Sequence, residues 1–251
     1  MSSETKIILA RIGIILAVFG AWELAPRAGL ADPRLLPPLS DVLVTLSQLL
    51  STPRFWAHLT ATLKVTVVGF LIALPLGAVL GILIAESRFA SAVFKPLVFF
   101  IFSIPKSIFL PIFILVFGIA FWQKVAFGIF STIFIVMMTA FAAIESVRAD
   151  HLRVARSYGA TTFQTVTRVY LPSMTPVLLE AVRLAMIFNF TGILLAEMYA
   201  SREGLGNVIG AWGQGFQLKQ LLAAILLVSG LAIIFNEIVR YFESKCEHWR
   251  S

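Results

Sequence analysis

The sequence predicts an all-α membrane protein, a single domain of 251 residues that crosses the bilayer six times. Apolar residues make up 59% of the chain and charged residues only 13%, whereas soluble domains usually carry about a quarter charged residues. Mean hydropathy is +0.92. The apolar residues also gather in blocks of about 20 residues, the length that a helix needs to cross a bilayer.

The six predicted spans cover residues 7–26, 62–85, 96–118, 125–144, 176–199 and 220–241. The first has a second interpretation as a cleaved signal, with Lys6 and Arg11 as its basic region and Ala28-Gly-Leu-Ala31 as the cleavage region. We favour a retained span, because the five later spans need a sixth to leave both termini on one side of the membrane.

The connection after the first span is polar and runs over residues 27–57. Leu39-Ser40-Asp41 resembles a helix cap, and residues 42–50 are typical of a short interfacial helix. In the second span Gly77 and Gly81 lie four residues apart, a spacing that permits close approach of two helices.

The third span follows a short polar turn, residues 86–95, and contains Pro96, Pro105, Lys106 and Pro111. Interior prolines predict a bend, with neighbouring helices satisfying the freed carbonyls. Between the last two spans, the glycines around Leu205 and Trp212 predict a flexible loop with an aromatic anchor.

The net charge of +7 does not indicate nucleic-acid binding, because basic residues are expected in cytoplasmic loops and near anionic lipid. The interval 145–172 is the longest polar one in the C-terminal half, and it holds four arginines: Arg148, Arg153, Arg156 and Arg168. This concentration favours a cytoplasmic position for the interval. Six spans then place both termini in the cytoplasm as well.

The same interval has the pattern of two short amphipathic helices. Leu152, Ala155 and Tyr158 form an apolar stripe that ends at Gly159, the residue type favoured at a helix C-terminus. Thr161 and Gln164 have the spacing of a capping box that starts the second helix. That helix presents Phe163, Val166 and Val169 or Tyr170 on one side and meets a boundary at Pro172. The pattern fits a docking surface for a soluble partner, and it also fits a solvated loop.

At this interval the sequence resembles the permease subunits of ATP-binding-cassette importers. Their signature is Glu-Ala-Ala, three residues, Gly, nine residues, Ile, one residue, Leu-Pro. Here the matching positions are Arg153, Val154, Ala155, Gly159 with Ala160 after it, Val169, Leu171 and Pro172. Arginine replaces the acidic residue of the signature, which leaves the ion pairs of docking open.

Further motifs resemble the nitrate, sulfonate and taurine branch of these importers, which also includes importers of pyrimidine precursors. They are Leu36-Pro-Pro-Leu-Ser-Asp-Val-Leu43, Ile104-Pro-Lys-Ser-Ile-Phe-Leu-Pro111 with Phe117-Gly118, Arg183-Leu-Ala185, Ala196-Glu-Met198 and Gly204-Leu-Gly206.

The resemblance implies the fold of a type I importer permease in the bacterial inner membrane and a pathway for a small solute. It also implies its partners: two ATPase subunits, a second permease copy, membrane lipid and an extracytoplasmic solute-binding protein. A sulfonate-, taurine- or nitrate-like anion is the expected solute, with a pyrimidine precursor or other small organic compound as the alternative. Whether the second permease is identical or merely related stays open.

Three polar residues lie inside the predicted spans and are candidates for the pathway or its gate: Lys106, Asn189 and Glu197. A lysine at the bilayer centre costs roughly 2.5–3.5 kcal/mol, so it is not expected to face lipid. Its alternative role is to cap carbonyls freed by the prolines. Asn189 has an alternative role as a helix–helix hydrogen bond, and Glu180 and Arg183 have the spacing of a structural ion pair.

Other classes are less favoured. The single cysteine allows no internal disulfide, the three histidines have no metal-ligand spacing, and we expect neither metal nor cofactor. No nucleotide-binding phosphate loop or hydrolase motif occurs, so ATP hydrolysis would belong to a separate subunit and this chain would not be an enzyme. A stand-alone secondary transporter or channel remains the alternative of another class.

Overall fold

The computed structural model describes residues 3–147 and 149–247, and every regular element in this part of the chain is helical. The prediction of an all-α fold is confirmed. Among the described residues, five helices are long and apolar enough to cross a membrane, or six if one sharply bent helix pair counts as a single span.

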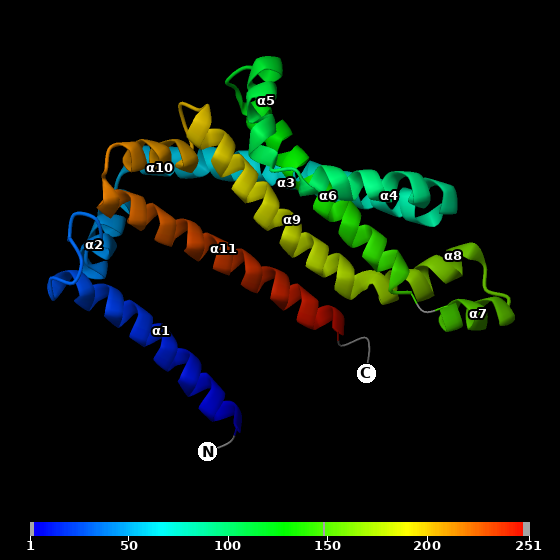
Figure 1. The fold of residues 1–251 in the computed structure, drawn as a ribbon. Helices are drawn as coiled ribbons and strands as arrows, with labels where there is room; N and C mark the ends of the chain where they lie inside the picture. The colour runs from blue at the N-terminus through cyan, green and yellow to red at the C-terminus, as the bar shows by residue number, and fades with distance from the viewer. Residues whose placement is uncertain (1–2, 148, 248–251) are drawn as a thin grey trace.

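The core is made by three long helices, α3 (Pro53–Glu86), α6 (Phe121–Glu145) and α9 (Leu171–Tyr199). In Figure 1 the three lie against one another at the centre of the molecule. The close approach predicted at Gly77 and Gly81 is confirmed. A Cβ on Gly81 would lie 2.6 Å from the Cβ of Ala140, and one on Gly77 would lie 2.8 Å from Val136. Small residues thus bring the α3 and α6 backbones together.

The third predicted span is interrupted. Helix α4 (Arg88–Ser103) is followed by a short 3₁₀ turn, η1 (Lys106–Phe109), and by α5 (Leu110–Phe117), and the two halves meet at 88°. The predicted bend is present and falls at Pro105 rather than at Pro96, which lies inside α4. The predicted polar turn over 86–95 is wrong, because helix α4 already begins at Arg88.

The N-terminal pair consists of α1 (Ser3–Arg27) and α2 (Leu39–Leu50). A helix is present over the predicted residues 42–50, but it already begins at Leu39. The predicted cap at Leu39-Ser40-Asp41 is therefore wrong: these residues lie inside α2, and no side chain of its own caps it. Instead the Glu23 carboxylate on α1 accepts hydrogen bonds from the backbone N–H and the hydroxyl of Ser40. An acidic group at a helix N-terminus is favourable, so α1 supplies the cap that the sequence of α2 lacks.

The C-terminal part contains α10 (Leu205–Gln214) and α11 (Leu218–Glu247). The prediction of a flexible loop between the last two spans is wrong, since α10 occupies most of it. Trp212 on α10 stacks on Phe55 of α3 with ring centroids 6.4 Å apart, and Leu205 is fully buried beside Phe55 and Leu59. The expected aromatic anchor is therefore present, on a packed helix.

Between α6 and α9 lie α7 (Ala149–Ser157), α8 (Thr162–Thr165) and a π-helical turn, η2 (Val166–Tyr170). Figure 1 places α7 and α8 at one end of the long helices and α10 at the other. We call these the hairpin end and the distal end.

Candidate functional site

The hairpin end carries the two predicted short helices. Gly159 separates them with φ +67°, a conformation that glycine adopts without a Cβ penalty. The capping box is confirmed: the Thr161 N–H donates to Gln164 Oε1 at 2.9 Å, and the Gln164 N–H donates to Thr161 Oγ1 at 3.3 Å. The turn between α7 and α8 is therefore set by local hydrogen bonds.

The second short helix is fixed to the core. Val169 and Tyr170 pack against a buried cluster of Ala143 on α6, Val147 just after it and Met174 on α9. The π turn leads directly into α9, whose first turn holds Pro172. Proline has no N–H to donate to the carbonyl four residues earlier, and its ring crowds that carbonyl. The wider π turn lies at Val166–Tyr170, just before Pro172, where this crowding occurs. The predicted boundary at Pro172 is present as the start of α9.

The first short helix projects outward. Tyr158 is 86% exposed and Val154 is 54% exposed; Arg153 is also exposed, and Ala155 and Ala160 are half-buried. Arg153 and Asp150 are 3.9 Å apart, a surface pair of little energetic weight. The side chains of Leu152, Arg156, Phe163, Val166 and Leu171, and the whole of Arg148, lie outside the described residues. The described part combines apolar and basic groups on a rigid support.

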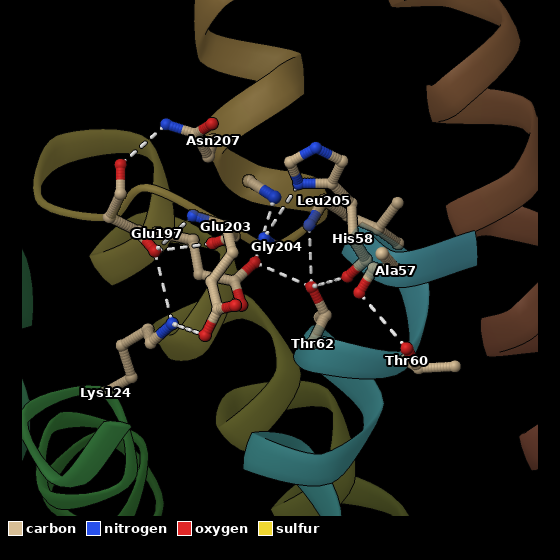
Figure 2. A network of polar contacts seen from close by, with 12 residues as sticks. Ala57, His58, Thr60, Thr62, Lys124, Glu197, Glu203, Gly204, Leu205 and Asn207 are labelled. Atoms are coloured by element: carbon tan, nitrogen blue, oxygen red, sulfur yellow. Dashed lines mark hydrogen bonds and ion pairs between the residues drawn. The ribbon is translucent and has the colours of Figure 1, made fainter. Parts of the chain in front are cut away.

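The distal end carries a buried polar cluster around Glu197, which is 0% exposed and is drawn in Figure 2. Its Oε2 accepts a hydrogen bond from Thr62 Oγ1 at 2.7 Å and from the Gly206 N–H at 3.0 Å. Thr62 Oγ1 also accepts from the Leu205 N–H at 2.7 Å. A carboxylate from α9 and a hydroxyl from α3 thus satisfy the first N–H groups of α10.

Glycine is required on both sides of Leu205. A Cβ on Gly204 would lie 2.2 Å from Glu197 Cδ, and Gly204 has φ +107°. A Cβ on Gly206 would lie 2.3 Å from the carbonyl oxygen of Leu194. The motif Gly204-Leu-Gly206 therefore lets the start of α10 close over the Glu197 side chain.

Lys106 lies at the break between α4 and α5. Its ammonium donates to the carbonyl oxygens of Phe102 at 2.6 Å, Ile104 at 3.0 Å and Ile101 at 3.1 Å. It also lies 4.8 Å from the Phe102 ring centroid and 5.8 Å from that of Phe134, within cation–π range. The interpretation of Lys106 as a cap for freed carbonyls is confirmed; its pathway role stays a prediction.

Asn189 is fully buried in the three-helix core. Its Nδ2 donates to the Thr66 carbonyl at 2.8 Å, so the interpretation as a helix–helix hydrogen bond is confirmed. A Cβ on Gly69 would lie 2.8 Å from Asn189 Oδ1, and a Cβ on Gly128 would lie 2.7 Å from the same oxygen. The oxygen is buried and has no hydrogen-bond partner among the described residues. Glu180 and Arg183 also pair as predicted, at 3.0 Å.

Sequence reasoning missed the partners of these residues. Thr62 lies 135 positions before Glu197, and a threonine inside an apolar span has no spacing that marks it. Lys124, near the start of α6, was also missed: it is 3% exposed, and no local pattern in the sequence marks it as buried. Among the described residues, no group of three or more His, Cys, Asp or Glu side chains is arranged to hold a metal.

The long apolar helices and the broken span define a helical protein that crosses a membrane several times. The family model described as "Binding-protein-dependent transport system inner membrane component" matches residues 73–248. The chain belongs to this family and is a permease subunit of an ATP-binding-cassette importer.

Curated relatives align over almost the whole chain. The formylaminopyrimidine transport permease protein ThiX of Halalkalibacterium halodurans is 29% identical, covering 91% of both chains. The putative aliphatic sulfonates transport permease protein SsuC of Bacillus subtilis is 26% identical, covering 93% of this chain and 85% of the relative. The taurine transport system permease protein TauC of Escherichia coli is 26% identical, covering 95% and 88%.

A solved structure of the MetNI methionine ABC transporter in an inward-facing conformation has a chain with a similar fold. The TM-score is 0.54 at 20% sequence identity, covering 84% of this chain and 98% of that one. At this identity the likeness concerns the fold alone, and it agrees with the type I importer permease fold expected from the sequence.

Proposed function

We propose that this permease forms the pathway of a bacterial inner-membrane importer, with both termini in the cytoplasm. A second permease copy completes the pathway, and an extracytoplasmic solute-binding protein delivers the solute at the distal end. Two separate ATPase subunits bind the hairpin end and hydrolyse ATP, while this chain carries no catalytic activity. The α7–α8 hairpin is the observation that carries the proposal. It exposes Val154 and Tyr158, and the turn η2 that follows it packs against α6 and α9.

The proposed ATPase contact uses the residues that match the family signature. They are Arg153, Val154, Ala155, Gly159, Ala160, Val169, Leu171 and Pro172. Arg153 and Val154 are exposed and belong to the contact itself. Gly159 adopts the positive φ that the turn between α7 and α8 requires, and Val169 packs against the core, so that the hairpin and the core move together. A soluble motor moves a helix bundle only through such a rigidly attached element.

The proposed solute is a small sulfonate- or taurine-like anion, because relatives named for taurine and aliphatic sulfonates align with nearly the whole chain. A pyrimidine precursor is the alternative, supported by the relative named for formylaminopyrimidine. Uptake of radiolabelled taurine and of a formylaminopyrimidine into cells that express the complete operon separates the two.

In this proposal, Lys106, Asn189 and Glu197 hold together the helices that form the walls of the pathway. Glu197 has the strongest connection to gating, because it joins α9 to α10 and to α3 at the distal end. Loss of uptake in Glu197→Gln with normal assembly supports a gate at this position. Full uptake in that variant removes Glu197 from the gate.

The test of the ATPase contact is a pull-down of the tagged chain from native membranes in mild detergent. A co-purifying protein with a phosphate-binding loop is expected. Gly159→Glu should abolish its recovery, because the variant strains a turn of positive φ and adds an acidic group to the contact. A Cβ at position 159 meets nothing within 4 Å, so the rest of the fold should persist.

Arg153→Glu tests the charge of the hairpin, and Arg202→Glu is its control because Arg202 is an exposed arginine at the distal end. We expect reduced ATPase recovery only for the hairpin variant. Undiminished recovery in Gly159→Glu contradicts the assigned contact. Recovery of the chain alone, where other transport complexes survive, favours a stand-alone transporter.

A further inference from the structure

A polar cavity of about 330 Å³ opens at the distal end, between the turn before α6 and the turn after α9. It is lined by Ile119, Ala120, Phe121, Lys124, Ala200, Ser201, Arg202 and Glu203. Two of these residues are cationic and one is acidic. Small-molecule sites usually measure about 300–1,000 Å³, so this cavity suits a small solute.

Lys124 is the buried charge of the cavity, with 4% of its side chain exposed. Its ammonium donates to Ser201 Oγ at 3.1 Å. It also lies 3.9 Å from Glu203 Oε1, and Figure 2 shows these two side chains facing each other. An ammonium has three donors and accepts nothing. Within the described part of the chain, one close hydrogen bond therefore leaves most of its donor capacity for a group in the cavity.

Glu203 is a weak partner for this charge. Its side chain is 67% exposed, and 3.9 Å exceeds hydrogen-bond length. The backbone around it is held independently, since its carbonyl accepts from Ser201 Oγ and its N–H donates to the same oxygen. The carboxylate can thus leave Lys124 without disturbing the turn. Arg202, also exposed at the cavity, adds a second positive charge.

We propose that the Lys124 cavity is a site for the anionic group of the transported solute, a sulfonate or a similar small oxyanion, with the Glu203 carboxylate as its internal competitor. The proposal rests on the proposed import of a small anion. The cavity lies at the distal end, on the turn that joins α9 to α10, so an anion bound there would lie beside the Glu197 contacts. Binding of an anion would then affect the position of the start of α10.

The test measures ligand-induced stabilisation of the purified full-length chain in detergent. Methanesulfonate and nitrate are the probes, and dimethyl sulfone is the neutral control of similar shape. We expect concentration-dependent stabilisation by the anions only. Glu203→Gln should tighten anion binding by up to about fivefold, since exposed ion pairs are weak. Lys124→Met should abolish it and Lys124→Arg should retain it.

Lys219→Met is the matched control, because Lys219 is a half-exposed lysine that pairs with Asp41 at 2.6 Å outside the cavity. Equal stabilisation by dimethyl sulfone overturns the site, and so does unchanged binding in Lys124→Met. If Lys124→Met fails to fold, weaker or unchanged binding in Glu203→Gln overturns it independently. None of these outcomes alters ATPase recovery in the pull-down, so the importer assignment is tested separately.

A lipid phosphate offers the same chemistry as a small oxyanion. The chain is therefore also measured in nanodiscs of phosphatidylcholine with and without phosphatidylglycerol. Stabilisation that follows the anionic lipid and is insensitive to methanesulfonate assigns the cavity to a lipid headgroup and overturns the solute site. Stabilisation by methanesulfonate in pure phosphatidylcholine supports it.

Discussion

Lys106 shows how one residue makes a break in a membrane helix tolerable. Pro105 ends the regular hydrogen bonding of α4 and leaves carbonyls without intrahelical donors. Unsatisfied carbonyls inside a bilayer cost several kcal/mol each. The ammonium of the half-buried Lys106 bonds the carbonyls of Phe102 and Ile104, and it also bonds that of Ile101, which accepts from the Ile104 N–H as well. The charge and the broken backbone thus satisfy each other.

Lys106→Met should therefore lower stability. We expect a loss of about 2–4 kcal/mol, because hydrogen bonds to charged groups contribute about 1.5–3 kcal/mol each and water can replace some of them. The measurement is the thermal unfolding midpoint in detergent, with Lys95→Met in the middle of α4 as a comparison. Lys106→Gln should keep most of the uptake affinity. A stable Lys106→Gln with weakened uptake affinity would instead favour a pathway role.

Gly204→Ala should be far more harmful than its single methyl group suggests. The added Cβ meets the Glu197 carboxylate at 2.2 Å in a backbone of positive φ, and we expect a loss of about 2–4 kcal/mol. Gly213→Ala on the same helix is the control, because a Cβ there meets nothing within 4 Å. Equal unfolding midpoints for the two variants would show that α10 can shift freely.

At the residue scale, the sequence predicts what kind of role a residue has better than it predicts which residues it contacts. The capping role of Lys106 follows from neighbouring prolines, and the bonding role of Asn189 follows from its membrane depth. The partner of Asn189 on α3 is 123 positions away, and no local pattern encodes such a pairing. The same holds for Thr62 and Glu197, which meet only because α3 and α9 pack together.

At the element scale, apolar length predicts the long helices well, since backbone hydrogen bonding in a bilayer leaves few alternatives. Two features were only partly predicted, for physical reasons. The prolines of the third span predict a bend, but they do not tell which of them interrupts the helix, and the structure has the break at Pro105. Helix α10 is rich in glycine, which disfavours helices by about 1 kcal/mol per residue, and it forms because Glu197 and Thr62 cap it and Trp212 packs on α3.

The packing of α3 on α6 gives a prediction at this scale. Gly81→Val should separate the two helices, because even a Cβ would lie 2.6 Å from Ala140 and 2.9 Å from the Met137 carbonyl. We expect aggregation or an early-eluting species in size-exclusion chromatography. Gly230→Val on α11 is the control, since nothing lies within 4 Å of its added Cβ. A monodisperse Gly81→Val with unchanged uptake would contradict this account of the core.

At the scale of the whole molecule, α9 joins the two ends. Its 29 residues correspond to about 43 Å of helix. One end follows directly from the hairpin, and the other carries Glu197 beneath α10. We therefore expect that a displacement of the hairpin moves the distal end directly, because the single helix α9 connects the two.

The number of crossings is the prediction that belongs to the whole chain. If α4 and α5 together cross the membrane once, the chain has six crossings, and both termini lie on one side. Green fluorescent protein fused to the C-terminus should then fluoresce, because it matures in the cytoplasm and not after export. Alkaline phosphatase fused there should be inactive. The reverse pattern would mean that α4–α5 enters and leaves on the same side.

The attachment of α1 has a consequence for how the protein is made. Most of its apolar side chains are exposed, and its described polar links to the rest of the chain lie at its C-terminal end, where Glu23 and Arg27 bond Ser40 and Trp22 bonds Pro37. Helix α1 can therefore insert into the bilayer as soon as it leaves the ribosome. Helix α3 cannot complete its hydrogen bonds so early, because the partners of Thr62 and of the Thr66 carbonyl lie on α9, which is synthesised later. At about 5–20 residues per second, synthesis from the end of α3 to the end of α9 takes roughly six to twenty-three seconds. During that time the few polar groups of this apolar helix lack their partners and are open to quality-control proteases.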